Sequence, residues 1–360
     1  MKIAKLSVVA FSLLSTLGCA SKINSFTVNT VLDRATDRPD IDRVCAVGEA
    51  LGIPLMSLTS KKHYPKKALI VAEVSAAICA EMEAREHALD IALAKKNLPP
   101  GAGKIGTIKD ARVRESRARQ LAALRYYAAF QYLEEQWGEA GGSCPTIKEK
   151  DEVAYFLGLH AGLMGTLHDS ASGRQIGVPQ GTLGKVARAT QCIDNQRWWN
   201  GPGAFQAAIW ATLGGEPEGI DPWELIEDQA RKGEKTGVRI GWATLALIAS
   251  NAGKEDLTER AITEFARALE TKPDANWAAL DEYSMMITRH ESDLIWIAAE
   301  GHRTETFGEL PQADVPVSPS EDGESPFGDE DNPFGEDDED PFSDDAEDGG
   351  GNPTPEENQP

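Results

Sequence analysis

The sequence lacks the short motifs that identify many enzymes and nucleotide-binding proteins. It has no nucleophile motif around a serine or cysteine, no cysteine pair at metal-ligand spacing and no phosphate-binding loop. The segment GAGKIGT, residues 101–107, does not have the spacing G-x-x-x-x-G-K-[ST], and it follows a predicted helix rather than a strand. We therefore expect a protein that is not an enzyme and that holds no metal and no cofactor.

Basic residues are absent from one whole region of the chain. Residues 312–360 contain 18 of the 58 acidic residues and none of the 36 lysines and arginines, so the rest of the chain is close to neutral. Neither part has the basic stripe that a phosphate backbone requires, and we predict no nucleic-acid partner.

The low apolar content of the C-terminal residues predicts a disordered acidic tail over residues 311–360. The Pro-Phe pairs at Pro326, Pro333 and Pro341 are either docking points for a partner or parts of a solvated tail.

The chain also has no apolar run long enough to cross a membrane near its start. Residues 1–18 combine two lysines with a short apolar stretch, which predicts a secretory signal peptide. The end of this stretch with the next residue, LSTLGC (residues 14–19), resembles the lipobox of bacterial lipoproteins, although Thr16 stands where that pattern usually has leucine. The resemblance implies that Cys19 is lipidated, that residues 19–38 form a lipidated leader, and that the lipid anchors the protein in a membrane. Ala20 after the cysteine resembles outer-membrane retention; ordinary cleavage near Ala20 is the alternative.

The other four cysteines are candidates for disulfide bonds. Secretion would place them in an oxidising compartment, where an even set of cysteines can pair in one of three ways. A buried free thiol is the alternative, above all for Cys79, which lies in an alanine-rich helical stretch. The candidates are Cys45, Cys79, Cys144 and Cys192.

Long stretches without helix-breaking residues point to an all-α domain over residues 39–310. Residues 66–98 contain neither glycine nor proline, which predicts one helix of about 50 Å or two helices with a tight break. A turn over residues 99–106 is expected to lead into a second long helix over residues 108–137. A third helix is expected over residues 183–195, and a last one over residues 278–299.

A short central stretch, residues 153–167, is apolar on every face, which predicts a buried helix. Gly158 and Gly162 lie four residues apart and form a stripe of small residues, so this stripe either packs closely against another helix or lines a cavity. His160 between them is expected to be an ordinary core histidine. A cluster of large aromatic residues follows, and together with the two glycines it makes our candidate ligand cavity: Trp198, Trp199, Phe205 and Trp210.

One segment, residues 245–273, carries a repeat-like pattern. Ala261, Phe265, Ala268 and Pro273 fit the second half of a tetratricopeptide repeat, the 34-residue helix-turn-helix unit. A single repeat cannot bury its own apolar face, so other helix pairs are expected to stack on it. The sequence thus predicts an all-α, tetratricopeptide-like helical bundle or solenoid.

Several segments together carry a resemblance to a known family: the cysteine followed by INSFTVNTVLD, PKKALIVAEVSAA, RARQLAALRYYAAFQYLE, AYFLGLHAGLMGTLHD and RATQCIDNQRWWNGPGAFQAAIWATLGGEP. They resemble the TatT family, lipoproteins associated with tripartite ATP-independent periplasmic (TRAP) transporters. The resemblance implies a tetratricopeptide-like fold, a homo-oligomer that is commonly a trimer, and a periplasmic solute-binding protein as partner. It implies no catalytic residue, and the acidic tail lies outside it.

The sequence therefore predicts a lipid-anchored scaffold in the cell envelope, on the outer membrane and facing the periplasm. In this interpretation it binds the extracytoplasmic solute-binding protein of a TRAP-type transport system and holds an apolar solute in its helical cavity. The alternative is a general tetratricopeptide-type protein-interaction lipoprotein in envelope assembly, with the acidic tail as its docking arm.

Overall fold

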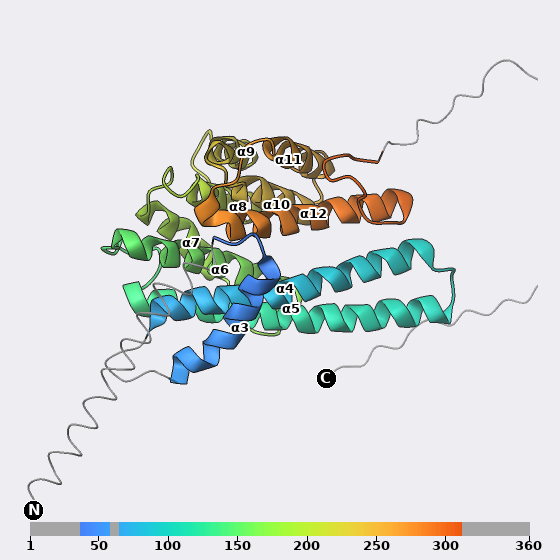
Figure 1. Ribbon diagram of the computed structural model, residues 1–360, viewed down its shortest axis with the longest axis horizontal. Coiled ribbons are helices and arrows are strands. Elements are labelled where there is room, and N and C mark those ends of the chain that lie inside the picture. Colours follow the sequence, from blue (N-terminus) through green and yellow to red (C-terminus); the bar gives the residue numbers. More distant parts are fainter. Residues whose placement is uncertain (1–36, 58–64, 312–360) are drawn as a thin grey trace, which may run out of the picture. The chain divides into compact units, whose positions relative to one another are not determined.

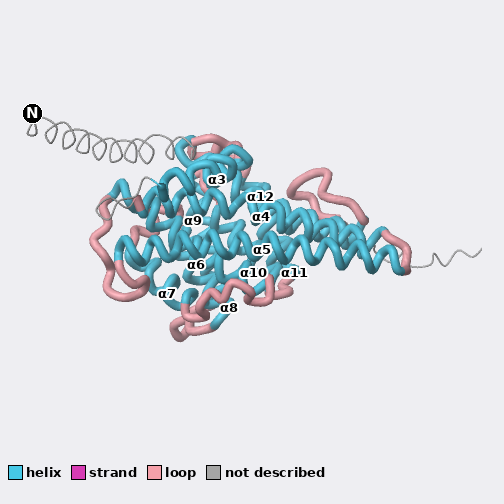
Figure 2. Tube along the Cα trace, turned by 90° about the horizontal axis from the view of Figure 1, so that it is seen from below, coloured by secondary structure: helices cyan, strands magenta, loops and turns pink. Residues whose placement is uncertain are grey.

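The computed structural model describes residues 37–57 and 65–311. All of them belong to the first of two compact units, Met1–Ala313, and the second unit is Asp314–Pro360. The described residues form ten α-helices and a few short 3-10 turns, with no strand among them (Figures 1 and 2). The predicted all-α bundle is confirmed. The predicted signal peptide, the lipidated Cys19 and the acidic tail lie outside the described residues.

The N-terminal part consists of α3 (Ile41–Ser57), α4 (Lys66–Asn97) and α5 (Ala102–Trp137). Helix α4 is a single uninterrupted helix of 32 residues, hence about 48 Å long. It forms a long hairpin with α5 whose tip extends beyond the neighbouring helices (Figure 1). The predicted turn over residues 99–106 is too long, because α5 already begins at Ala102. Lys104, in its first turn, donates to the carbonyls of Lys95 and Leu98 and so ties the two helix ends together.

Helix α6 (Glu152–Ala171) lies at the centre and contacts α4, α5, α7 and α8. Most of its residues are buried, as its apolar sequence predicts. None of the helices that the structure describes, α6 included, is long and apolar enough to cross a membrane.

The C-terminal half is a series of helices shorter than α4 and α5, each in contact with the next: α7 (Thr182–Ala189), α8 (Gly201–Leu213), α9 (Pro222–Gly233), α10 (Ile240–Asn251), α11 (Glu255–Ala268) and α12 (Ala278–Glu300). The predicted helix over residues 183–195 is too long, because the chain passes through a 3-10 turn, Thr190–Cys192, into a loop. Asn195 stabilises this loop: its side-chain oxygen accepts a hydrogen bond from the Gly203 N–H at 2.7 Å.

Helices α10 and α11 form the hairpin that the repeat-like pattern indicates, and Ala261, Phe265 and Ala268 are buried in it. The fully buried Arg239 joins this hairpin to α12. Its guanidinium donates to the Ala268 and Thr271 carbonyls at the end of α11 and to the Asp281 carboxylate at 2.5 Å. The connection between α11 and α12, which carries Trp277, is thereby fixed at both ends.

Two disulfides link elements that are distant in sequence. Cys45 in α3 is bonded to Cys79 in α4, and Cys144 is bonded to Cys192. The second bond joins the loop before α6 to the 3-10 turn after α7. Four cysteines can pair in three ways, and the structure contains the pairing Cys45–Cys79 with Cys144–Cys192.

Candidate ligand-binding site

Four helices, α3, α4, α6 and α12, enclose a narrow apolar crevice. Helix α6 lines it with Val153, Phe156 and His160, which lie one helical turn apart and span about 10 Å along the helix. The cavity volume of the crevice is about 60 Å³. Pockets for drug-sized ligands are typically about 300–1,000 Å³. The crevice therefore suits a slender apolar chain rather than a bulky ring system.

A wider and more open groove adjoins the crevice. Val153, Trp199 and Trp277 line both spaces, so they mark the junction. The rim of the groove is charged and comprises Lys148, Glu149, Lys150 and Arg197. The volume of the groove is about 700 Å³. A ligand in the crevice would thus emerge at a polar, solvent-exposed mouth.

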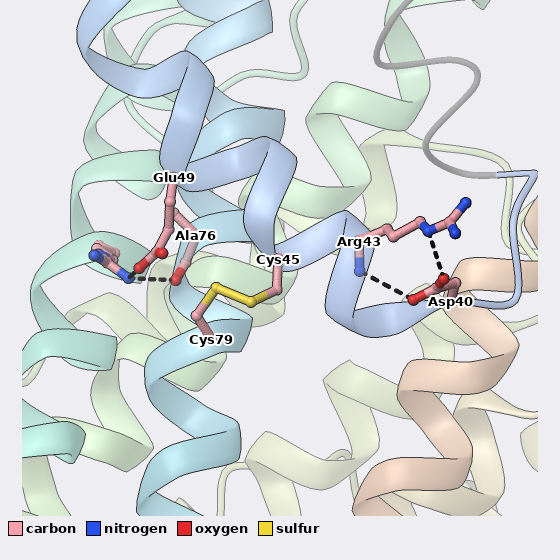
Figure 3. The surroundings of a disulfide bond; sticks show 7 residues. Asp40, Arg43, Cys45, Glu49, Ala76 and Cys79 are labelled. Atoms are coloured by element: carbon pink, nitrogen blue, oxygen red, sulfur yellow. Dashed lines mark hydrogen bonds and ion pairs between the residues drawn. A yellow bond between two sulfur atoms is a disulfide. The ribbon is translucent and has the colours of Figure 1, made fainter.

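Helix α3 forms one wall of the crevice and is firmly held against α4 (Figure 3). The disulfide Cys45–Cys79 lies next to two lining residues, Val44 and Ile78. One turn further, Gly48 touches α4 so closely that a Cβ atom there would lie 2.4 Å from the Ala76 backbone nitrogen. This wall is fixed by a covalent bond and by a backbone contact that only glycine permits.

An arginine of α5 adds a polar tie on the same side of α3. The Arg125 guanidinium donates to the Glu49 carboxylate at 2.9 Å and to the Ala76 carbonyl at 2.6 Å. It therefore bridges α3 and α4, next to the close contact at Gly48.

Trp199, at the junction, has a left-handed backbone conformation that is costly for a bulky residue. Its φ is 54°, and that of the following Asn200 is 59°. Such strain persists only where the surroundings over-determine it. Here Asn195 donates to the Asn200 side chain at 3.2 Å, and a Cβ on Gly233 would lie 2.2 Å from the Trp199 carbonyl oxygen. The loop and α9 therefore hold Trp199 at the mouth of the crevice.

The inner end of the crevice meets a buried polar cluster. His160 and Tyr283 line the crevice, and their rings contact edge to face at 5.3 Å. The Tyr283 and Tyr126 hydroxyls donate to the Glu81 carboxylate at 3.0 and 2.6 Å, and Arg85 donates to its other oxygen at 2.7 Å. The buried Nδ1 atom of His160 has no hydrogen-bond partner among the described residues.

One arginine, Arg85, lies between two buried acids in this cluster, Glu81 and Glu291. Burial favours the protonated form of Glu81, but Arg85, His168 and Tyr126 outweigh it and hold the pKa of the carboxyl well below its usual value. Burial lowers the pKa of His160 to about 4, so this imidazole is neutral at pH 7. Glu81 and Arg85 thus form an ion pair beside a neutral histidine, and Glu291 contacts the same guanidinium at 3.5 Å, so the inner end of the crevice offers no unpaired cation.

The cluster is not arranged for metal binding. Within residues 37–57 and 65–311, no group of three histidine, cysteine, aspartate or glutamate side chains could hold a metal ion. Burial also lowers the pKa values of His168 and His290, which lie nearby and stay neutral at pH 7. These three histidines are buried polar residues of the interior.

The structure separates the residues of the predicted cavity. The glycine stripe faces other helices: a Cβ on Gly158 would lie 2.5 Å from Leu133, and one on Gly162 would lie 2.6 Å from Val186. Close packing, one of the two alternatives for this stripe, is what the structure shows.

The aromatic residues of the predicted cavity have different positions. Trp199 lines the crevice and the groove, whereas Trp198 lines the groove alone. Phe205 lies behind the lining and stacks on Phe156 at 5.3 Å. Trp210 is half-buried in α8 and lines neither space.

No local sequence pattern predicts the polar cluster. Glu81, Tyr126 and Tyr283 lie on α4, α5 and α12, and no local spacing relates them. A glutamate and an arginine four residues apart, Glu81 and Arg85, normally indicate an exposed ion pair on a helix surface. The one available signal was the alanine-rich surroundings of Glu81, which are typical of a buried helix face.

No family model matches the chain, and no match was found among the curated proteins or the solved structures compared with it. The TatT resemblance therefore stays a prediction.

Proposed function

We propose that this protein is a lipid-anchored, periplasm-facing helical scaffold that binds an apolar solute. In this proposal it works with the extracytoplasmic solute-binding protein of a TRAP-type transport system. The observation that carries the proposal is the crevice between α3, α4, α6 and α12, whose walls are almost entirely apolar and which opens to solvent at Trp199 and Trp277. The lipobox-like sequence at Cys19 and the TatT resemblance support the location and the partner.

Three features support a binding role over simple packing. An apolar crevice is retained although filling it would stabilise the fold. Two of the three described non-glycine residues with positive φ, Trp199 and Asn200, lie where the crevice opens. The buried Nδ1 atom of His160, in the wall of the crevice, has no hydrogen-bond partner in the part of the chain that the structure describes, and a ligand hydroxyl or carbonyl could satisfy it.

Solute binding is tested by filling the crevice. Leu280 lines it, and Leu280→Trp would occupy the space with a larger side chain. We expect this variant to lose binding of an alkyl-chain probe in a fluorescence titration. Leu269→Trp, at an exposed leucine outside the crevice, should bind like the wild type. Equal binding by both variants, with unchanged thermal unfolding, would contradict the proposed site. Native mass spectrometry of the purified protein should also show a retained apolar ligand.

The partner and the anchor are tested in cells. A pull-down of the detergent-solubilised protein is expected to recover a TRAP-type solute-binding protein, and recovery of no transporter component would contradict the transport role. Metabolic labelling with a fatty acid should mark the wild type and not Cys19→Ala. An unlabelled wild type would contradict the lipid anchor.

A further inference from the structure

Two lysines at the mouth of the crevice have no partner of opposite charge within residues 37–57 and 65–311. Lys148 and Lys150 are exposed on the rim of the groove, and neither forms an ion pair with any residue that the structure describes. Asp151 contacts Lys67 at 2.6 Å, and Glu149 and Glu152 share the single guanidinium of Arg197, so the groups around the rim carry one positive charge in excess. The rim therefore presents two ammonium groups that a ligand can engage.

The opposite end of the crevice is unsuited to a charged group. The Glu81–Arg85 pair there is already satisfied, and His160, in the wall, is neutral at pH 7. Moving a carboxylate into this buried region would cost its hydration without supplying a free cation, and it would approach Glu81. A charged ligand group is therefore favoured only at the mouth.

The covalent framework fixes the mouth. Lys148 follows Cys144 by four residues, and Trp199 follows Cys192 by seven, so the disulfide joins the two segments that form the rim. In addition, the Trp198 indole donates to Glu152 at 2.9 Å, which ties the second segment to the start of α6. The lysines and the tryptophan thus belong to one cross-linked rim, so a head group and an apolar chain could be recognised together.

We propose that the site takes an amphipathic carboxylate. Its alkyl chain passes Trp199 into the crevice, and its carboxylate stays in the groove beside Lys148 and Lys150. This inference rests on the proposed solute-binding role of the crevice, and it adds the chemical class of the ligand and its orientation.

The test compares three probes that share one medium-length alkyl chain and differ in the head group: a carboxylate, an alcohol and a trimethylammonium. Binding to the full-length protein is measured by calorimetry at low salt. We expect the carboxylate to bind about three- to tenfold more tightly than the alcohol, the range for one or two exposed charge pairs, and the ammonium to bind most weakly. Added salt should reduce the preference for the carboxylate, because exposed charges are screened.

Two double variants test whether the rim lysines cause the preference for the carboxylate probe. Lys148→Gln/Lys150→Gln should bind carboxylate and alcohol equally while keeping wild-type affinity for the alcohol. Lys109→Gln/Lys235→Gln removes two other exposed lysines and should keep the preference. Equal binding of carboxylate and alcohol by the wild type overturns this inference and leaves the proposed function standing. A preference that survives in the Lys148/Lys150 variant also overturns it. Failure of all three probes overturns both proposals.

Discussion

The Tyr283 hydroxyl donates a hydrogen bond to the Glu81 carboxylate at 3.0 Å, across 202 residues of sequence. This bond joins α12 to α4 at the inner end of the crevice, where Tyr283 is also a lining residue. The same carboxylate oxygen accepts from Tyr126 of α5, so one buried glutamate connects three helices. The polar cluster therefore both connects these helices and closes the inner end of the crevice.

Tyr283→Phe removes this hydrogen bond with little change in shape. Since the acceptor is a charged and fully buried carboxylate, we expect a loss of about 1.5–3 kcal/mol in the free energy of unfolding, measured by urea denaturation. Tyr155→Phe is the matched control, because Tyr155 is equally buried but its hydroxyl makes no hydrogen bond to another described residue. It should cost less than about 1 kcal/mol. Equal losses in the two variants would show that the bond to Glu81 contributes no special stability.

The buried histidines predict that stability falls on mild acidification. The pKa of His160 is lowered to about 4 in the folded protein by burial, whereas an unfolded chain has a value near 6.5. Between these two values the unfolded state binds more protons, so the free energy of unfolding decreases as pH falls from about 6.5 to about 4. His160 alone should account for roughly 2 kcal/mol at pH 5. His168 and His290 are shifted in the same direction and add to the effect.

The contribution of His160 to this pH dependence of stability can be measured by comparing the wild type with His160→Gln, whose side chain does not titrate. The stability difference between wild type and variant should be constant above pH 7 and should shift in favour of the variant as pH falls toward 4. A difference independent of pH would contradict a buried, neutral His160. Glu81 affects stability in a more acidic pH range than the histidines. Its pKa is lowered in the folded protein, so its contribution to the free energy of unfolding is fully present above about pH 4.5 and is lost only in stronger acid.

Gly48→Ala is expected to push α3 away from α4. The added Cβ would lie 2.4 Å from the Ala76 backbone nitrogen, which cannot rotate aside. We expect a loss of about 1–3 kcal/mol in stability and weaker binding of the alkyl-chain probe, because α3 is a wall of the crevice. Gly52→Ala on the same helix has its nearest neighbour at 3.8 Å and should be neutral or stabilising by up to about 1 kcal/mol. Unfolding curves and probe titrations of the two variants decide between these outcomes.

Gly233→Ala tests how Trp199 is held at the mouth. A Cβ there would lie 2.2 Å from the Trp199 carbonyl oxygen, so the strained loop must move. We expect reduced affinity for the alkyl-chain probe together with a loss of about 1–3 kcal/mol in stability. Gly184→Ala in α7, whose nearest neighbour is an arginine side chain at 3.5 Å, should leave both unchanged or slightly improved. Unaltered binding in Gly233→Ala would mean that the position of Trp199 does not matter for the ligand.

The helices themselves were largely predictable from the sequence. The absence of glycine and proline from residues 66–98 defined α4, and the all-apolar stretch 153–167 defined a buried α6. Boundaries were less accurate where tertiary contacts replaced local signals. Helix α5 runs through Gly103 and Gly106, whereas the loop before α8 is held by the side chain of Asn195.

The crevice and its polar end were decided by the tertiary structure. Helical periodicity acts over three or four residues, so a sequence shows which side of a helix is apolar but not which neighbour covers it. The glycine stripe at Gly158 and Gly162 was compatible with a cavity or with close packing, and the side chains of Leu133 and Val186 fill it. The partners of Glu81 come from helices 45 and 202 residues away, and only the packing of α4, α5 and α12 brings them to one carboxylate.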